Sequence, residues 1–104
     1  YKASAIMARA AMQRAVRILK AEGKNLYEEI EFLRKQGVIT MQLADFAHEV
    51  RIAGNDIAHP DHITEVNEKE IEESLDFLDG FLEVVFVLPA IAERRKDERK
   101  STKC

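Results

Sequence analysis

Apolar side chains recur every three or four residues along most of this chain, and that spacing is typical of helices that each bury one face. No segment alternates apolar and polar residues as a half-buried strand would. Short loops between such helices predict an all-α fold, an antiparallel four-helix bundle. The predicted helices cover residues 3–22, 25–37, 41–58 and a last stretch that starts at Thr64 or Asn67.

Capping residues mark the predicted helix ends. Asn25 and Asn67 each precede a glutamate by three residues, which is the spacing of a capping box. Thr40 is placed to cap the third helix. Gly23 and Gly37 are predicted to end the first and second helices.

The third helix carries Gly54 in its interior. Glycine costs a helix about 1 kcal/mol relative to alanine. We therefore expect another helix to approach closely at this point.

The fourth helix is more apolar between Phe81 and Ala92 than one buried face requires, with Glu83 as its only charged residue there. The stretch is too short to span a bilayer, so no membrane partner is expected. Pro89 is predicted to kink it. Two explanations stay open: a central helix packed on several sides, or a homodimer interface. The second would use helical faces that include Phe81, Val84, Phe86 and Val87.

From Glu93 onward the charges are mixed in sign, which is typical of a solvated chain end. We therefore expect a helical domain over residues 1–92 and a charged C-terminal tail over residues 93–104. The first residue is Tyr1 rather than methionine, which suggests a piece of a longer protein.

Composition supports a folded domain in a reducing compartment. The chain has 104 residues, of which 46% are hydrophobic and 34% charged, the balance of a single small domain. Its one cysteine, Cys104, allows no internal disulfide, and no charged-then-apolar leader is present, so a cytoplasmic location is expected. A net charge of -3 argues against a generally basic nucleic-acid binder, although a local basic patch can still bind phosphate.

One polar row on the third helix is the candidate site. Helical spacing places His48, Arg51, Asn55 and His59 on one side, and Pro60 sets His59 at or just past the last turn. A guanidinium can hold a phosphate through two hydrogen bonds, and an imidazole can transfer a proton near neutral pH. These are the groups needed for metal-free RNA cleavage, in which the 2′-hydroxyl of the substrate is the nucleophile.

The same residues also have a structural explanation. Arg51 could pair with a neighbouring carboxylate, and His59 could cap the last carbonyls of the helix. The relevant carboxylates are those of Asp45, Glu49 and Asp56.

Other chemistry finds little support in the sequence. There is no glycine-rich phosphate loop, no cysteine pair and no His-Glu-x-x-His motif. The three histidines, His48, His59 and His62, include no pair four residues apart. We expect neither a metal site nor a cofactor.

Three blocks carry a family resemblance: residues 5–13, residues 26–33 and the segment from Val50 to His59, which reads Val-Arg-Ile-Ala-Gly-Asn-Asp-Ile-Ala-His. Together they resemble a bacterial family of uncharacterised helical domains that we place close to the HEPN superfamily (higher eukaryote and prokaryote nucleotide-binding). The similarity runs from about Ala3 to Ile91. Its members occur alone or fused to restriction-type and other defence proteins.

The resemblance implies a dimeric helical bundle that binds RNA or a nucleotide, since active members of the superfamily are metal-independent RNases. Arg51 would then contact the phosphate and stabilise the transition state, His59 would transfer the proton and Asn55 would be an orienting amide. Arg9, in the first block, would be a second phosphate contact. From the polar row, we also expect His48 to contact the substrate. Eight helical steps from Arg51 to His59 make a little over two turns, so both lie on one side.

A function of another class is also consistent with the sequence. Gly54, Asn55 and His59 could fix the bend between the third and fourth helices in a non-catalytic domain. That domain would dimerise a larger protein or mediate its interactions.

Overall fold

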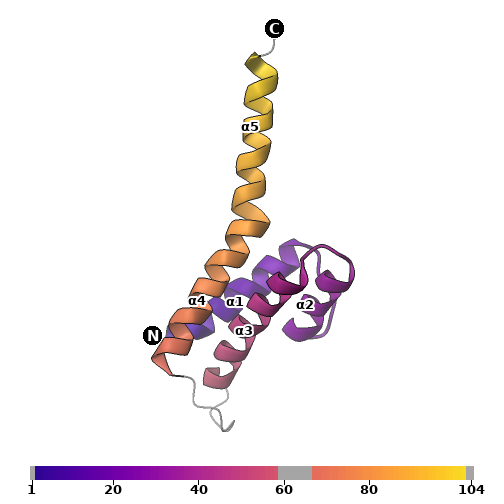
Figure 1. Ribbon diagram of the computed structural model, residues 1–104. Coiled ribbons are helices and arrows are strands. Elements are labelled where there is room, and N and C mark those ends of the chain that lie inside the picture. The colour runs from indigo at the N-terminus through magenta and orange to yellow at the C-terminus, as the bar shows by residue number, and fades with distance from the viewer. Residues whose placement is uncertain (1, 59–66, 103–104) are drawn as a thin grey trace.

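The computed structural model describes residues 2–58 and 67–102, and all regular structure within them is helical. The predicted all-α class is therefore confirmed for this part of the chain. His59, Pro60 and His62 lie outside the described residues. The elements, shown in Figure 1, are α1 (Lys2–Ile18), α2 (Leu26–Lys35), α3 (Met41–Ala58), α4 (Glu68–Leu82), the π turn η1 (Glu83–Val87) and α5 (Leu88–Thr102).

The predicted N-terminal caps are all present. Asn25 Oδ1 accepts a hydrogen bond from the Glu28 amide at 2.9 Å, and Asn67 Oδ1 accepts one from the Glu70 amide at 2.9 Å. Thr40 Oγ1 accepts from the amide three residues on at 3.1 Å. Each bond satisfies a donor that the first helical turn leaves unpaired, so the starts of α2, α3 and α4 follow from local sequence.

The helix ends agree with the prediction at α2 but not at α1. Gly37, with φ 75°, directly follows the cap of α2 and donates to the Arg34 carbonyl at 3.1 Å, as expected. However, α1 ends at Ile18, four residues before the predicted end. There Lys20 takes φ 65°, and Ala21 donates back across the last turn, so a lysine does what the sequence assigned to Gly23.

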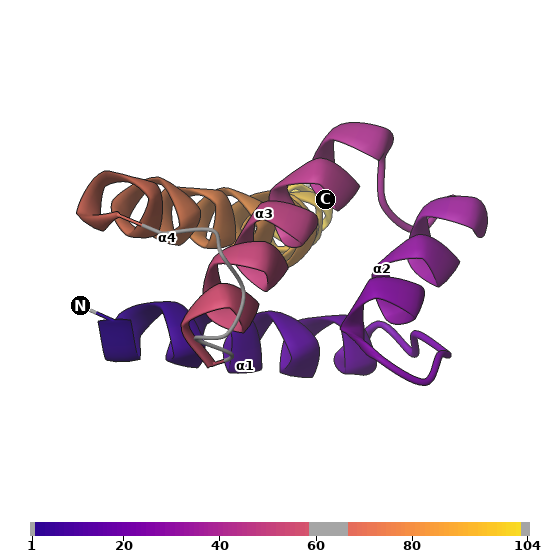
Figure 2. The ribbon, with the colours of Figure 1, turned by 90° about the horizontal axis from the view of Figure 1, so that it is seen from below.

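Helix α3 is the centre of the packing. It lies against α1, α2 and α4, while α2 flanks α1 and α3 and does not reach α4 within the described residues. Figure 2 shows α3 crossing α1 with α4 on one side and α2 on the other. The largest fully buried side chains are Met12, Val16, Leu26, Ile30, Leu33, Val50, Ile71 and Phe81.

Phe81 belongs to this core. Its exposed fraction is 0%, and it packs among side chains of the other helices. It therefore cannot contribute to an outer dimer face, contrary to the expectation from sequence. Of the residues named for that face, Val84 and Val87 are exposed and Phe86 is half-buried.

Helices α4 and α5 and the π turn η1 between them form one rod that extends beyond the other helices. The residues that join α4, η1 and α5 all keep helical backbone angles, and the molecule measures 64 × 27 × 19 Å. Helix α5 extends away from the body and contacts only η1 within the described residues (Figure 1). The segment expected as a charged tail from residue 93 is thus helical as far as Thr102.

Pro89 explains the π turn. Proline has no amide hydrogen, and its ring collides with the carbonyl four residues earlier in a regular α-helix. In the turn just before it, the Leu88 amide bonds to the carbonyl of Glu83, five residues back. The wider turn accommodates the proline, so the rod stays helical through it, and its direction changes between α4 and α5, where the sequence predicted a kink (Figures 1 and 2).

Candidate functional site

A chain of hydrogen bonds links α3 to α2. Arg51 Nε donates to His48 Nδ1 at 3.2 Å, and His48 Nε2 lies 2.9 Å from Glu31 Oε2. Because Nδ1 accepts from Arg51, the ring hydrogen belongs on Nε2, which then donates to the carboxylate. Glu31 Oε1 in turn accepts two bonds from Arg34, at 3.0 and 2.8 Å. We call these four residues with Tyr27 the polar cluster.

Tyr27 contacts the Arg51 end of the polar cluster. Its ring centroid lies 5.1 Å from that of His48, and Arg51 Cζ lies 5.2 Å from the Tyr27 centroid. A guanidinium over an aromatic face is attracted by the ring quadrupole. Arg51 is therefore positioned both by a hydrogen bond within α3 and by an aromatic ring from α2.

Electrostatics fix the charge of Glu31. Hydrogen bonds from Arg34 and then from His48 lower the pKa of its carboxyl group from 4.5 to about 2. The hydrogen bond between Arg34 and Glu31 also raises the pKa of Arg34. The carboxylate at the centre of the polar cluster thus stays ionised at any physiological pH.

The lowered pKa of Glu31 makes the free energy of unfolding depend on pH. Ionised Glu31 stabilises the fold above its ordinary pKa of 4.5, and this contribution is lost as the pH falls toward about 2. We expect Glu31→Gln to cost about 1 kcal/mol at pH 7 and almost nothing near pH 2, as measured by urea unfolding at both pH values. The exposed Glu22 makes no hydrogen bond within the described residues, so Glu22→Gln is the control. A cost for Glu31→Gln that does not change with pH would contradict this account.

A second arginine lies where α1 crosses α3. A Cβ added at Gly54 would come within 2.5 Å of Arg9 Cβ and 2.7 Å of the Ala5 carbonyl oxygen. The close approach predicted at Gly54 is confirmed, and only glycine allows it. Arg9 Nε is buried there without a hydrogen-bond partner.

The sequence-predicted residues are thus partly brought together. His48 and Arg51 are in contact, and Asn55 lies half-buried one turn further along α3. Arg9 packs against Gly54, which follows Arg51 by three residues. His59 lies outside the described residues.

Sequence reasoning missed the contribution of α2. Tyr27 and Glu31 are four residues apart and Arg34 follows three later, so all three share one side of that helix. This spacing was visible in the sequence. That this side turns toward His48 and Arg51 depends on how α2 docks, which periodicity does not specify.

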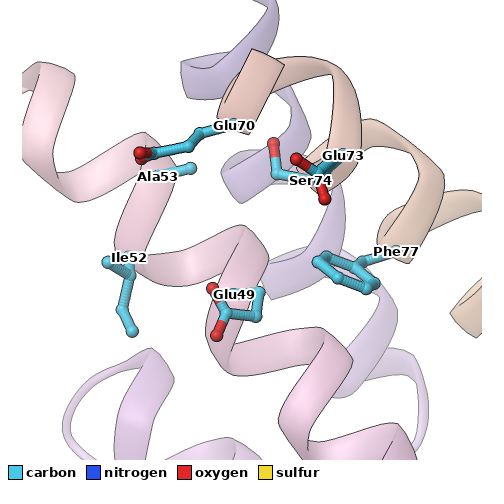
Figure 3. A pocket seen from close by; sticks show the side chains of 7 residues that line it. All are labelled: Glu49, Ile52, Ala53, Glu70, Glu73, Ser74 and Phe77. Atoms are coloured by element: carbon cyan, nitrogen blue, oxygen red, sulfur yellow. The ribbon is translucent and has the colours of Figure 1, made fainter. Parts of the chain in front are cut away.

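A groove beside α3 is lined by acidic residues. A groove of about 310 Å³ lies between α3 and α4, and Glu49, Glu70 and Glu73 bring three carboxylates to it (Figure 3). Such a groove repels phosphate.

Nowhere in residues 2–58 and 67–102 do three histidine, cysteine or acidic side chains gather closely enough to hold a metal ion. Nor does any helix in those ranges have the length and apolarity to cross a membrane.

Comparison with known proteins places most of the chain in a family. The model of a family described as Domain of unknown function (DUF4145) matches residues 1–99. Searches of curated proteins and of solved structures give no match.

Proposed function

Since the chain belongs to the DUF4145 family, whose function its description leaves open, we propose from the site itself that it is a nucleotide- or RNA-binding helical domain. Arg51 and Arg9 would contact phosphate. The HEPN-like bundle and a role in a prokaryotic defence or toxin system are parts of the same proposal. They rest on the resemblance of the Arg51 to His59 block.

The observation that carries the proposal is the uncompensated charge of Arg9. Arg17 pairs with Glu29 at 3.1 Å, and Arg34 pairs with Glu31 at 2.8 Å. Arg9 has neither a hydrogen bond nor an ion pair within the described residues. A buried donor without a partner costs about 1–3 kcal/mol, which an anionic oxygen could recover after a small shift of the side chain.

Arg51 supplies the orientation that a phosphate contact requires. Stacking on Tyr27 and the bond to His48 restrict the guanidinium, so less side-chain entropy is lost when a ligand binds. Gly54 lies three residues after Arg51 and holds Arg9 against the same helix. Both arginines are thus held against α3, and each would contribute one phosphate contact.

Binding is tested with a fluorescein-labelled single-stranded RNA, followed by polarisation. We expect Arg51→Ala and Arg9→Met each to weaken binding about tenfold and to reduce the salt slope by about 1, since each removes one phosphate contact. Methionine keeps most of the aliphatic stem that packs on Gly54. The control is Arg14→Met, an exposed arginine elsewhere on α1. Equal affinities for all three variants would refute the site.

Cleavage is a separate part of the proposal. The 2′-hydroxyl would lose its proton to His59 and attack the adjacent phosphorus, and the bond to the 5′-oxygen would break as that oxygen takes a proton from solvent. The products are a 2′,3′-cyclic phosphate and a 5′-hydroxyl, and Arg51 would stabilise the charge on phosphorus. We expect such products in excess EDTA from the unaltered chain but not from His59→Ala. Binding without these products would leave a non-catalytic RNA-binding domain.

A dimerisation or interaction module of a larger protein is the second candidate. The exposed apolar residues of η1 and the outgrown rod favour it. In that case Arg51→Ala would mainly lower stability, because the polar cluster would serve only to join α2 to α3. Thermal unfolding of the same variant distinguishes the two.

A further inference from the structure

Apolar side chains are exposed halfway along the rod. Val84, Val87 and Leu88 are 48%, 42% and 48% exposed, and Ile91, one turn further, is half-buried. Val84 also lines a groove of about 530 Å³ that reaches the α2–α3 connection. These four residues form the apolar patch.

The two halves of the rod carry opposite charge. Helix α4 contains six acidic residues and one lysine, whereas α5 contains five basic and three acidic residues. Because the rod is continuous, α5 cannot fold back onto its own α4. Local pairs occupy Arg94 and Lys96 of α5, but Arg95 and Arg99 have no ion pair within the described residues.

We propose that the apolar patch binds a second copy of this chain, with the two rods antiparallel and α5 of each along α4 of the other. A two-fold axis between Val87 and Leu88 pairs Val84, three residues before Val87, with Ile91, three residues after Leu88. It also pairs Asp76, eleven residues before Val87, with Arg99, eleven residues after Leu88.

Helical geometry favours this side of the rod. The side of α4 that faces the core is marked by buried Ile71, Ser74, Leu78 and Phe81. Asp76 is exposed and lies on the outward side. The rod has about 50 Å of helix for pairing, at a rise of about 1.5 Å per residue. Parallel pairing would instead place α4 beside α4 and set like charges together, which is unfavourable.

The first test is the mass in solution, measured by sedimentation and light scattering of the chain at about 100 µM. We expect twice the 11.9 kDa of one chain. Asp76→Arg should weaken the dimer at least tenfold, since it sets two like charges together at two symmetric places. The double variant Asp76→Arg/Arg99→Asp should restore it. Asp97→Arg, the same change on another side of α5, is the control and should have no effect.

The second test fixes the register by disulfide formation in a Cys104→Ser background. Val84→Cys/Ile91→Cys should cross-link two copies on oxidation, while Val84→Cys alone should not, because antiparallel pairing sets the two copies of residue 84 about 10 Å apart along the rods. Within one chain the two cysteines are also too far apart to bond. A monomeric mass from the unaltered chain, or cross-linking by the single variant, would overturn the proposal. RNA binding could still hold in either case.

Discussion

Phe81→Ala is expected to lower the free energy of unfolding by about 3–5 kcal/mol, which is the usual cost of emptying a fully buried aromatic site. The ring is 0% exposed and lies in the core that α1, α3 and α4 share. Urea unfolding followed by circular dichroism measures the loss. All samples need one chain concentration, because association would make apparent stability depend on it.

The matched control is Phe77→Ala, one turn earlier on α4. Phe77 is half-buried and stacks on Phe46 with centroids 5.3 Å apart, so about 1–2 kcal/mol should be lost. If Phe81→Ala left stability unchanged and only reduced dimer formation, Phe81 would be an interface residue after all.

Gly54→Ala should cost about 2–3 kcal/mol, although alanine is the better helix former. The new Cβ would meet Arg9 Cβ at 2.5 Å and the Ala5 carbonyl oxygen at 2.7 Å, so a helix backbone has to move. Thermal unfolding should show a midpoint about 10 °C lower.

Gly80→Ala is the control for this change. Gly80 lies inside α4, and a Cβ there would have nothing within 4 Å, so alanine should stabilise by about 0.5–1 kcal/mol. Opposite signs at the two glycines would isolate the helix crossing as the cause. Stabilisation at both would mean that α1 and α3 can separate at little cost.

Local signals in the sequence predicted most of the fold. The caps at Asn25, Thr40 and Asn67 determine where three helices begin, because each satisfies free amides within its own first turn. The interior Gly54 correctly indicated a close crossing, because a helix tolerates glycine poorly without a packing reason. The end of α1 was misjudged, because Lys20 takes a left-handed conformation that residue type alone does not favour.

The site was predicted less completely, because it depends on tertiary contacts. The spacing of His48 and Arg51 showed that they share a side of α3, but not that Tyr27 and Glu31 lie opposite them. Phe81 was assigned to a surface because the whole stretch around it is apolar. Only the packing of α4 on α1 and α3 distinguishes the buried Phe81 from the exposed Val84.

The π turn before Pro89 sets the angular phase between the two halves of the rod. A single residue turns an α-helix by about 100°, and a π turn holds one residue more than an α turn, so re-forming η1 as regular α-helix with all its residues kept would swing α5 about the axis by roughly that amount. Arg95 and Arg99 would then leave the side of the rod on which Asp76 lies. One proline and the widened turn it requires thus determine on which side of the rod the basic residues of α5 lie relative to the acidic residues of α4.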